Sequence, residues 1–113
     1  MEVRAVAKNI RRSPQKVRLV ADVVRGMTVR EALSALKLMP QGAAEDVYKV
    51  VKSAAANAEN NFEMDGDNLY LHRIYVDEGP TLKRYRARSH GRPAPRLRRS
   101  SHITAVVDEK GAR

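Results

Sequence analysis

The sequence predicts an α+β fold, in which a small antiparallel three-stranded sheet packs against three helices and a long β-hairpin protrudes. Three observations predict this fold. Apolar residues recur at helical spacing in the first half of the chain, and segments dense in β-branched residues lie on both sides of residues 79–101. That stretch holds eight Lys and Arg and no acidic residue. A chain of 113 residues suits a single domain, which we expect to span residues 1–113.

The first expected elements are a short strand and a helix. Residues 2–8 alternate small apolar side chains with Arg4 and Lys8, which is typical of a strand with a basic outer face. Ser13-Pro14 indicates a helix start, because the Ser hydroxyl can accept a backbone N–H at the N-cap and Pro fits the first helical position. We expect this helix to end at Gly26 and to bury a face made of Val17, Val20, Ala21 and Val24.

Two further helices are expected before residue 61. Thr28 and Glu31 have the spacing of a capping box, in which each side chain satisfies the other residue's backbone N–H, and Pro40 closes the segment that they open. The third and longest helix is expected from Gly42 to Asn60, with charged residues on the side opposite its apolar face. That apolar face consists of Ala43, Val47, Val50, Val51, Ala54 and Ala58.

Two strands are expected in the second half of the chain. A turn cluster at residues 65–68, Asp-Gly-Asp-Asn, precedes them. Residues 69–76 are dense in β-branched, aromatic and aliphatic side chains, and residues 102–107 place Ile103, Ala105 and Val107 at every second position. Helices on one side of such a sheet give an α+β domain.

The composition points to a polyanionic partner. The chain holds 22 Lys and Arg against 13 Asp and Glu, a formal charge of +9. The charge is also segregated: residues 1–30 and 79–107 are strongly basic, whereas residues 31–78 are acidic overall. Such an oriented distribution favours a binding side for a polyanion over the alternative, an evenly solvated basic surface.

Several protein classes are excluded by what the sequence lacks. The absence of cysteine removes disulfide scaffolds, thiolate nucleophiles and zinc knuckles. No signal-peptide core is found at the start of the sequence, and no apolar run exceeds three residues, against about 20 for a membrane span. We therefore expect a soluble cytoplasmic protein with no membrane partner.

Residues 79–101 do not have the composition of a core. Loops longer than about 12–15 residues are uncommon in compact domains and are usually functional or disordered. Gly91 and Pro93 offer a reversal point, so the flanking strands are expected to continue outward as a basic hairpin, ordered by phosphates that its arginines bind. The alternative is a disordered basic loop that touches RNA loosely. The candidate RNA-binding residues are Lys83, Arg84, Arg86, Arg88, Arg92, Arg96, Arg98 and Arg99.

The first helix supplies a second group of candidate RNA contacts. Arg18 and Arg25 are seven residues apart and project to the same side, and helix N-termini attract anions. The alternative is that Arg18, Asp22 and Arg25 form only a surface ion-pair ladder of little energetic value. The candidates in this region are Arg11, Arg12, Lys16, Arg18 and Arg25.

The sequence gives little support to three other kinds of function: an enzyme, a sequence-reading nucleic-acid module and a membrane-active peptide. His72, His90 and His102 are widely separated and lack the spacing of metal ligands, and Asp65 and Asp67 fit a simple turn better than a calcium loop. We expect no enzyme activity, no cofactor and no metal. The aromatic residues do not form the pattern of an RNA-recognition motif. The second helix carries only two cations, too few for helix-turn-helix reading of duplex DNA, and the best amphipathic helix lacks the lysine-rich face of a membrane-active peptide.

Several segments resemble the twenty-second-protein family of the large ribosomal subunit. The similar segments cover nearly the whole chain in the family's order. They are Ser13-Pro14-Gln15-Lys16-Val17-Arg18-Leu19-Val20-Ala21-Asp22, Ser53-Ala54-Ala55-Ala56-Asn57-Ala58-Glu59-Asn60, Val76-Asp77-Glu78-Gly79-Pro80-Thr81-Leu82-Lys83-Arg84, Gly91-Arg92 and Arg99-Ser100-Ser101-His102-Ile103-Thr104.

The resemblance implies a structural and assembly role in the large subunit without catalysis. Its implied partners are large-subunit rRNA of the 23S type, neighbouring ribosomal proteins and the nascent peptide in the exit tunnel. Lys83 and Arg84 correspond to the root side of the family's hairpin. The chain departs from the family at Ala87, where proline is common, and at Ser89 and Pro93, where alanine is common. The tip that would face the tunnel consists of Arg88, Ser89, His90, Gly91 and Arg92.

Overall fold

The structure is a computed structural model that describes residues 2–79, 82–87, 93–98 and 100–109. Strand β1 (Val3–Ile10) leads into three helices, α1 (Pro14–Val24), α2 (Val29–Leu38) and α3 (Gly42–Phe62). A short 3₁₀ turn, η1 (Gly66–Asn68), precedes the strands β2 (Leu69–Glu78), β3 (Leu82–Ala87), β4 (Pro93–Arg98) and β5 (Ser101–Glu109). Among all the residues that the structure describes, no helix has the length and apolar character that crossing a bilayer requires.

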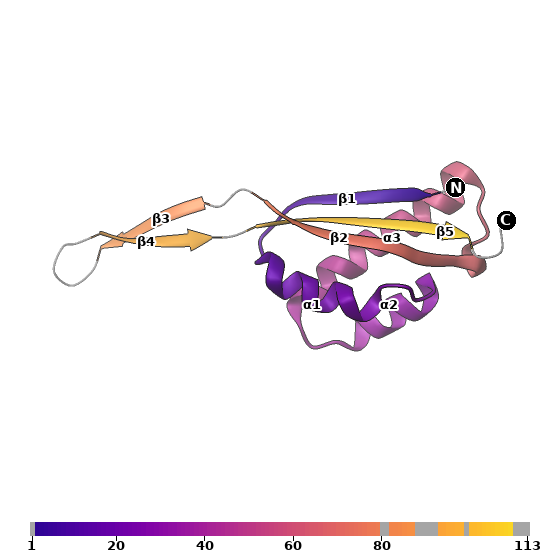
Figure 1. Ribbon diagram of the computed structural model, residues 1–113, viewed down its shortest axis with the longest axis horizontal. Helices are drawn as coiled ribbons and strands as arrows, with labels where there is room; N and C mark the ends of the chain where they lie inside the picture. The colour runs from indigo at the N-terminus through magenta and orange to yellow at the C-terminus, as the bar shows by residue number, and fades with distance from the viewer. Residues whose placement is uncertain (1, 80–81, 88–92, 99, 110–113) are drawn as a thin grey trace.

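The main sheet has three antiparallel strands in the order β1-β5-β2. The helices lie on one side of it (Figure 1), and they bury Val3 of β1, Ile74 and Val76 of β2, and Ile103 of β5. Strands β3 and β4 form a separate two-stranded sheet. The predicted α+β fold with its three-stranded sheet and three helices is thereby confirmed.

The hairpin β3–β4 extends away from the body along the long axis of the molecule (Figure 1). The molecule measures 65 × 25 × 19 Å, and its radius of gyration is 17.2 Å. A compact chain of this length has a radius of gyration of about 13 Å. The excess reflects a thin projection from a small body.

Helix α3 is the central element of the core. All six residues of its predicted apolar face are buried, and Ala44 and Ala55 are buried with them. The small alanine and valine side chains of α3 allow it to contact α2, β1 and β5 closely. The helix runs two residues beyond the predicted Asn60, because the chain turns at Glu63, which has a left-handed backbone (φ 52°) and donates its N–H to the Ala58 carbonyl. The core is built from aliphatic side chains, as the low aromatic content predicts.

The two predicted N-caps behave differently. The Thr28 hydroxyl accepts a hydrogen bond from the Glu31 N–H at 3.2 Å, so Thr28 is confirmed as the N-cap and as one half of the predicted capping box. The predicted cap at Ser13 is wrong in one respect: its hydroxyl makes no capping hydrogen bond, although Ser13 does occupy the N-cap position. The start of α1 depends on Pro14 at the first turn and on the Ser13 carbonyl, which accepts from the Val17 N–H.

Both outer strands of the main sheet contain an irregularity. The pairing of β1 with β5 shifts register between Ala7 and Ile10, where Asn9 has a left-handed backbone (φ 58°). The pairing of β2 with β5 shifts between Leu71 and Arg73. Such bulges bend a strand and increase its twist.

Candidate nucleic-acid interface

The hairpin β3–β4 has a regular register that groups its cationic positions. Arg84 lies directly opposite Arg96, and Leu82 and Arg86 lie opposite Arg98 and Ala94. Because residues two apart in a strand share a face, Arg84, Arg86, Arg96 and Arg98 occupy one face of the ribbon and Lys83 the other. Arg88, Arg92, Arg99 and the predicted tip lie outside the described residues.

The root of the hairpin is held by close backbone packing. The pairing of β2 with β5 ends at Glu78 and Ser101, and the Gly79 N–H then donates to the Ser100 carbonyl at 2.9 Å. A Cβ atom on Gly79 would lie 2.6 Å from the Ser100 hydroxyl and 3.3 Å from the Ser100 carbonyl carbon, so a larger residue there would require the Ser100 side chain to rotate away. Ser101 is fully buried, and its hydroxyl donates to the Arg12 carbonyl at 2.6 Å. This bond ties the start of β5 to the segment that enters α1.

The N-terminus of α1 lies beside the hairpin root. Arg11 and Lys16 are exposed there, and a polar hollow of about 410 Å³ opens between Ser13–Gln15, Arg18 and Glu78. The unpaired N–H groups of a helix N-terminus favour anions. The structure thus brings Arg11, Arg12, Lys16 and Arg18 of the predicted helix-region cations next to the base of the basic hairpin.

Arg12 is engaged with the body of the protein. Its Nε donates to the Asp46 carboxylate of α3 at 2.6 Å, and 41% of its side chain remains exposed. The two residues are 34 positions apart in sequence. The sequence marks Arg12 only as one of several cations before α1 and does not reveal this partner.

Arg18 and Arg25 bind the outer edge of β2. Arg18 donates to the Val76 carbonyl from Nε at 3.1 Å and from Nη2 at 2.9 Å. Arg25 donates to the Ile74 carbonyl from Nη2 at 3.0 Å and to Asp22 from Nη1 at 2.6 Å. The ion-pair ladder that was the alternative to an RNA contact is therefore only half formed, because Arg18 binds the strand and only Arg25 pairs with Asp22. The two hydrogen bonds from Arg18 to the Val76 carbonyl come from Nε and Nη2, and Nη1 takes no part in them.

The face of the main sheet away from the helices carries functional candidates that the sequence interpretation did not single out. Arg4 and Lys8 of β1 are exposed on this open face, as are Arg73 and Tyr75 of β2. The alternation in residues 2–8 indicates the basic character of β1, but not that this side of the sheet stays uncovered. The same face holds a chain of polar contacts in which the Tyr70 hydroxyl lies 3.0 Å from His72 Nδ1, and His72 Nε2 lies 3.1 Å from the Glu2 carboxylate.

Two groups on the open face have shifted pKa values. Burial opposes ionisation of Asp108, but the hydrogen bond from the Glu109 N–H and nearby positive charge outweigh burial, and the pKa of the carboxyl is lowered. The hydrogen bond between Arg73 and the Tyr75 hydroxyl raises the pKa of the Arg73 guanidinium. An arginine is charged at any physiological pH, so the second shift leaves the charge of the face unchanged.

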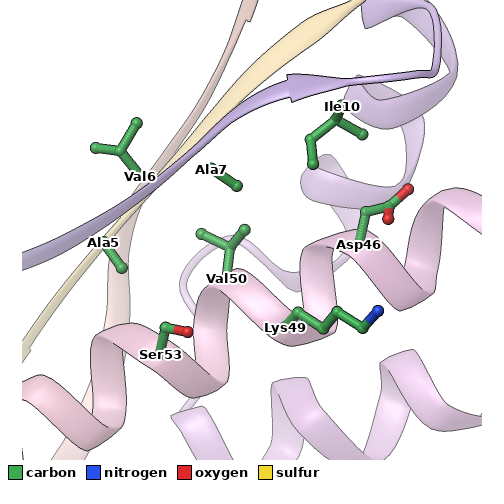
Figure 2. A pocket seen from close by; sticks show the side chains of 8 residues that line it. All are labelled: Ala5, Val6, Ala7, Ile10, Asp46, Lys49, Val50 and Ser53. Carbon is green, nitrogen blue, oxygen red and sulfur yellow. The ribbon is translucent and has the colours of Figure 1, made fainter.

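A small groove lies between β1 and α3 (Figure 2). The side chains of Ala5, Ala7 and Val50 line its apolar part, and Asp46 and Lys49 lie at its rim. Its volume of about 150 Å³ is below the 300–1,000 Å³ of typical small-molecule sites. This groove therefore does not compete with the basic surfaces as the candidate site.

Comparison with known proteins shows one consistent family. The model of the family described as ribosomal protein L22p/L17e matches residues 5–108. A protein of Thermomicrobium roseum named large ribosomal subunit protein uL22 is 51% identical to this chain over 115 aligned residues, covering 99% of this chain and 98% of the relative. A protein of the same name from Clostridium novyi is 53% identical over 110 residues, covering 97% and 99%.

Proposed function

The chain belongs to the ribosomal protein L22p/L17e family, and from this membership we propose that it binds rRNA, supports assembly of the large ribosomal subunit and lines the nascent-peptide exit tunnel with its hairpin tip. Membership of this family gives the chain a structural role in the ribosome, and the prediction that it is not an enzyme is confirmed. Its partners in the proposal are 23S-type rRNA, neighbouring ribosomal proteins and the nascent peptide. Its location is the large subunit in the cytoplasm.

The main support for the proposed rRNA binding is the shape and charge of the hairpin. Strands β3 and β4 form a sheet of their own that projects from the body (Figure 1), and four arginine positions share one face of it. An isolated two-stranded ribbon is marginally stable in water, and opposed arginines weaken it further. Phosphate groups would remove that repulsion and add bidentate hydrogen bonds. The hairpin is therefore best explained as an element that rRNA stabilises.

The body supplies a second part of the proposed rRNA contact. Arg11 and Lys16 are exposed next to the N-terminus of α1, beside the hairpin root. The proposed contact also includes three arginines that already make hydrogen bonds within the protein. Arg12 binds Asp46, and Arg18 and Arg25 bind carbonyls of β2. Their role in the proposal is accordingly mixed, because each stabilises the body and also presents charge at its surface.

The tunnel-lining role rests on family membership and on the reach of the hairpin. The long axis of the molecule exceeds each of the other two axes by more than twofold, so the tip residues would stand far from the body. In this proposal, Arg88, Ser89, His90, Gly91 and Arg92 face the tunnel, and Arg99 contacts rRNA with the other basic residues of the arm.

Co-sedimentation with large ribosomal subunits tests the proposed function. We expect the full-length protein to remain with the large-subunit particle after a high-salt wash, because an inserted hairpin is held by many phosphate contacts at once. A loosely bound basic protein would be released, since screening removes its attraction. Release into the supernatant at high salt would contradict the proposal.

A further inference from the structure

The chain turns from β1 into α1 at the same end of the main sheet from which the hairpin leaves (Figure 1). At this end the register of β1 with β5 shifts between Ala7 and Ile10. Lys8 and Asn9 of β1 therefore face only His102 of β5, which is the two-against-one arrangement of a β-bulge. Asn9 has the left-handed backbone (φ 58°) that asparagine tolerates better than most residues. The extra residue of a bulge is left unpaired by the ladder, so its N–H requires another acceptor.

The side chain of His102 supplies this acceptor. The Asn9 N–H donates to Nδ1 of His102 at 3.1 Å, although the two residues are 93 positions apart. A ring nitrogen that accepts a hydrogen bond carries no proton, so Nδ1 is the unprotonated nitrogen of the imidazole. A Cβ atom on Gly79 would lie 3.2 Å from Cε1 of the same ring. The imidazole therefore lies between the bulge of β1 and the point where β2 leads into the hairpin.

Ser101 binds the same segment from the other face of the sheet. Its buried hydroxyl donates to the Arg12 carbonyl at 2.6 Å, and consecutive side chains of a strand point to opposite faces. Between these two attachments, the Arg12 N–H donates to the Ile10 carbonyl at 2.8 Å, which closes a tight turn. Two neighbouring residues of β5 thus fix both ends of residues 9–12, one from each face.

The segment fixed in this way contains Arg11, one of the cations in the proposed rRNA contact. Arg11 is exposed, whereas Arg12 already pairs with Asp46, so Arg11 is the residue of the segment best able to bind a phosphate. A mobile segment would have to become ordered when RNA binds, and this ordering costs free energy. A segment that is held in place beforehand avoids that cost. The bond to His102 should therefore strengthen the contribution of Arg11 to binding.

We propose that His102 is a positioning residue for rRNA binding: its Nδ1 holds the bulge at Asn9 and thereby fixes Arg11 beside the root of the hairpin. The inference rests on the proposed function, which supplies the RNA and places Arg11 among its contacts. The essential part of His102 in this role is the acceptor nitrogen, and the ring itself does not have to touch RNA.

Two substitutions separate the acceptor from the ring. His102→Asn keeps an acceptor bonded to Cγ, where Nδ1 is, and removes the ring, whereas His102→Phe keeps a ring and removes the acceptor. The affinity of full-length variants for deproteinised large-subunit rRNA is measured at one moderate salt concentration. We expect His102→Phe to weaken binding by as much as Arg11→Ala does, roughly tenfold, and His102→Asn to stay within about twofold of the unmodified protein. The reverse order would show that the ring contacts RNA directly and would overturn the proposal.

A double-mutant cycle tests whether His102 acts through Arg11. If it does, Arg11→Ala should lower the affinity for rRNA by less than about threefold in the His102→Phe background, because the benefit of positioning Arg11 is already lost. Arg84→Ala, in the hairpin, is the matched control and should lower the affinity by the same factor in both backgrounds. Additive effects of His102→Phe and Arg11→Ala would contradict the proposal.

Nuclear magnetic resonance of the free protein provides a readout that does not depend on RNA. We expect a scalar coupling across the hydrogen bond between the Asn9 amide nitrogen and Nδ1 of His102. The Arg12 amide should exchange faster with solvent in His102→Phe and remain protected in His102→Asn. The Leu71 amide, which donates to the Met27 carbonyl at the same distance of 2.8 Å, is the control and should be unaffected. Absence of the coupling would show that His102 does not hold the bulge.

The outcomes separate this inference from the proposed function. If the unmodified protein and His102→Phe bind rRNA equally tightly, His102 is not a positioning residue, although the protein remains an rRNA-binding one. If the unmodified protein fails to bind rRNA, the proposed function itself is wrong, and the role of His102 in binding falls with it.

Discussion

Arg18 donates two hydrogen bonds, from Nε and Nη2, to the single backbone oxygen of Val76. Val76 belongs to β2, which forms one edge of the main sheet, and Arg25 binds the carbonyl of Ile74 on the same strand. Carbonyls two residues apart point to the same side of a strand. Two arginines of α1 therefore satisfy successive acceptors on the outer edge of β2, whose other end is bridged by residues 26–28. The seven-residue spacing of Arg18 and Arg25, which suggests an RNA-binding face, therefore also lets both side chains hold α1 against β2. We call these two contacts the clamp.

The first prediction concerns this clamp. Removing the guanidinium in Arg18→Ala should lower the free energy of unfolding by about 1–2 kcal/mol, because hydrogen bonds from a charged donor are lost and a partly buried carbonyl loses its partner. Arg18→Lys should recover only part of the loss, since lysine lacks the planar fork. Chemical denaturation measures both changes. The exposed Lys16 on the same helix is the control, and Lys16→Ala should change stability by less than about 0.5 kcal/mol.

The second prediction contrasts the two N-cap residues. Thr28→Ala should cost about 1 kcal/mol of unfolding free energy, because the Glu31 N–H loses its acceptor. Ser13→Ala should cost clearly less, since the Ser13 hydroxyl makes no capping hydrogen bond. Thermal unfolding of the two variants tests the contrast, and a larger cost at Ser13 would contradict it.

The third prediction concerns pH. The pKa of Asp108 is lowered in the folded protein below its ordinary value of 3.8, so its ionised form stabilises the fold above that pH. This contribution is lost as the pH falls through the folded-state pKa. Asp108→Asn should therefore unfold a few degrees below the unmodified protein at neutral pH, and the two melting temperatures should converge as the solution becomes strongly acidic. A difference that stayed constant down to low pH would show that packing, and not charge, is responsible.

The fourth prediction separates the hairpin from the body. The main sheet closes at the Gly79–Ser100 backbone hydrogen bond, so an Asn-Gly turn in place of residues 80–99 should join β2 to β5 in a favoured two-residue hairpin. We expect the melting temperature of the body to be nearly unchanged and the affinity for large-subunit rRNA to fall strongly. The smaller deletion of residues 89–93 should likewise leave the melting temperature unchanged. A large loss of stability in either variant would show that the hairpin packs on the body.

The fifth prediction uses the opposed arginines of the hairpin. Arg96→Glu places a carboxylate opposite Arg84, which should slow amide hydrogen exchange in β3 and β4 of the free protein because repulsion becomes attraction. The same change should weaken rRNA binding and make its salt dependence shallower, by roughly one to two units of slope in a plot of log affinity against log salt. Faster exchange, or an unchanged slope, would count against the assigned register or its role in binding.

The sequence predicts those elements whose signals are local. The buried face of α3 follows from helical periodicity, and the Thr28 cap follows from a three-residue spacing. The strands of the projecting hairpin follow from the charge and length of residues 79–101, and β3 and β4 confirm them. Each of these signals depends on neighbouring residues in the chain, so no knowledge of the tertiary arrangement is needed.

The parts that the sequence does not predict depend on contacts between distant segments. Arg18 and Val76 are 58 residues apart, and Arg12 and Asp46 are 34 residues apart. The partners of these arginines are decided by where α1 and α3 lie against the sheet. The exposure of Tyr75 has the same origin, because alternation identifies the two sides of β2 but not which side the helices leave open.

Both outer strands of the main sheet are poor templates for a second copy of the protein. A bulge with a left-handed Asn9 interrupts β1, and β2 combines a register shift with carbonyls already bound by arginine. Interrupted and blocked edges discourage the edge-to-edge addition through which sheets aggregate. In newly synthesised molecules that outnumber their rRNA, these two edges of the main sheet should consequently contribute little to self-association.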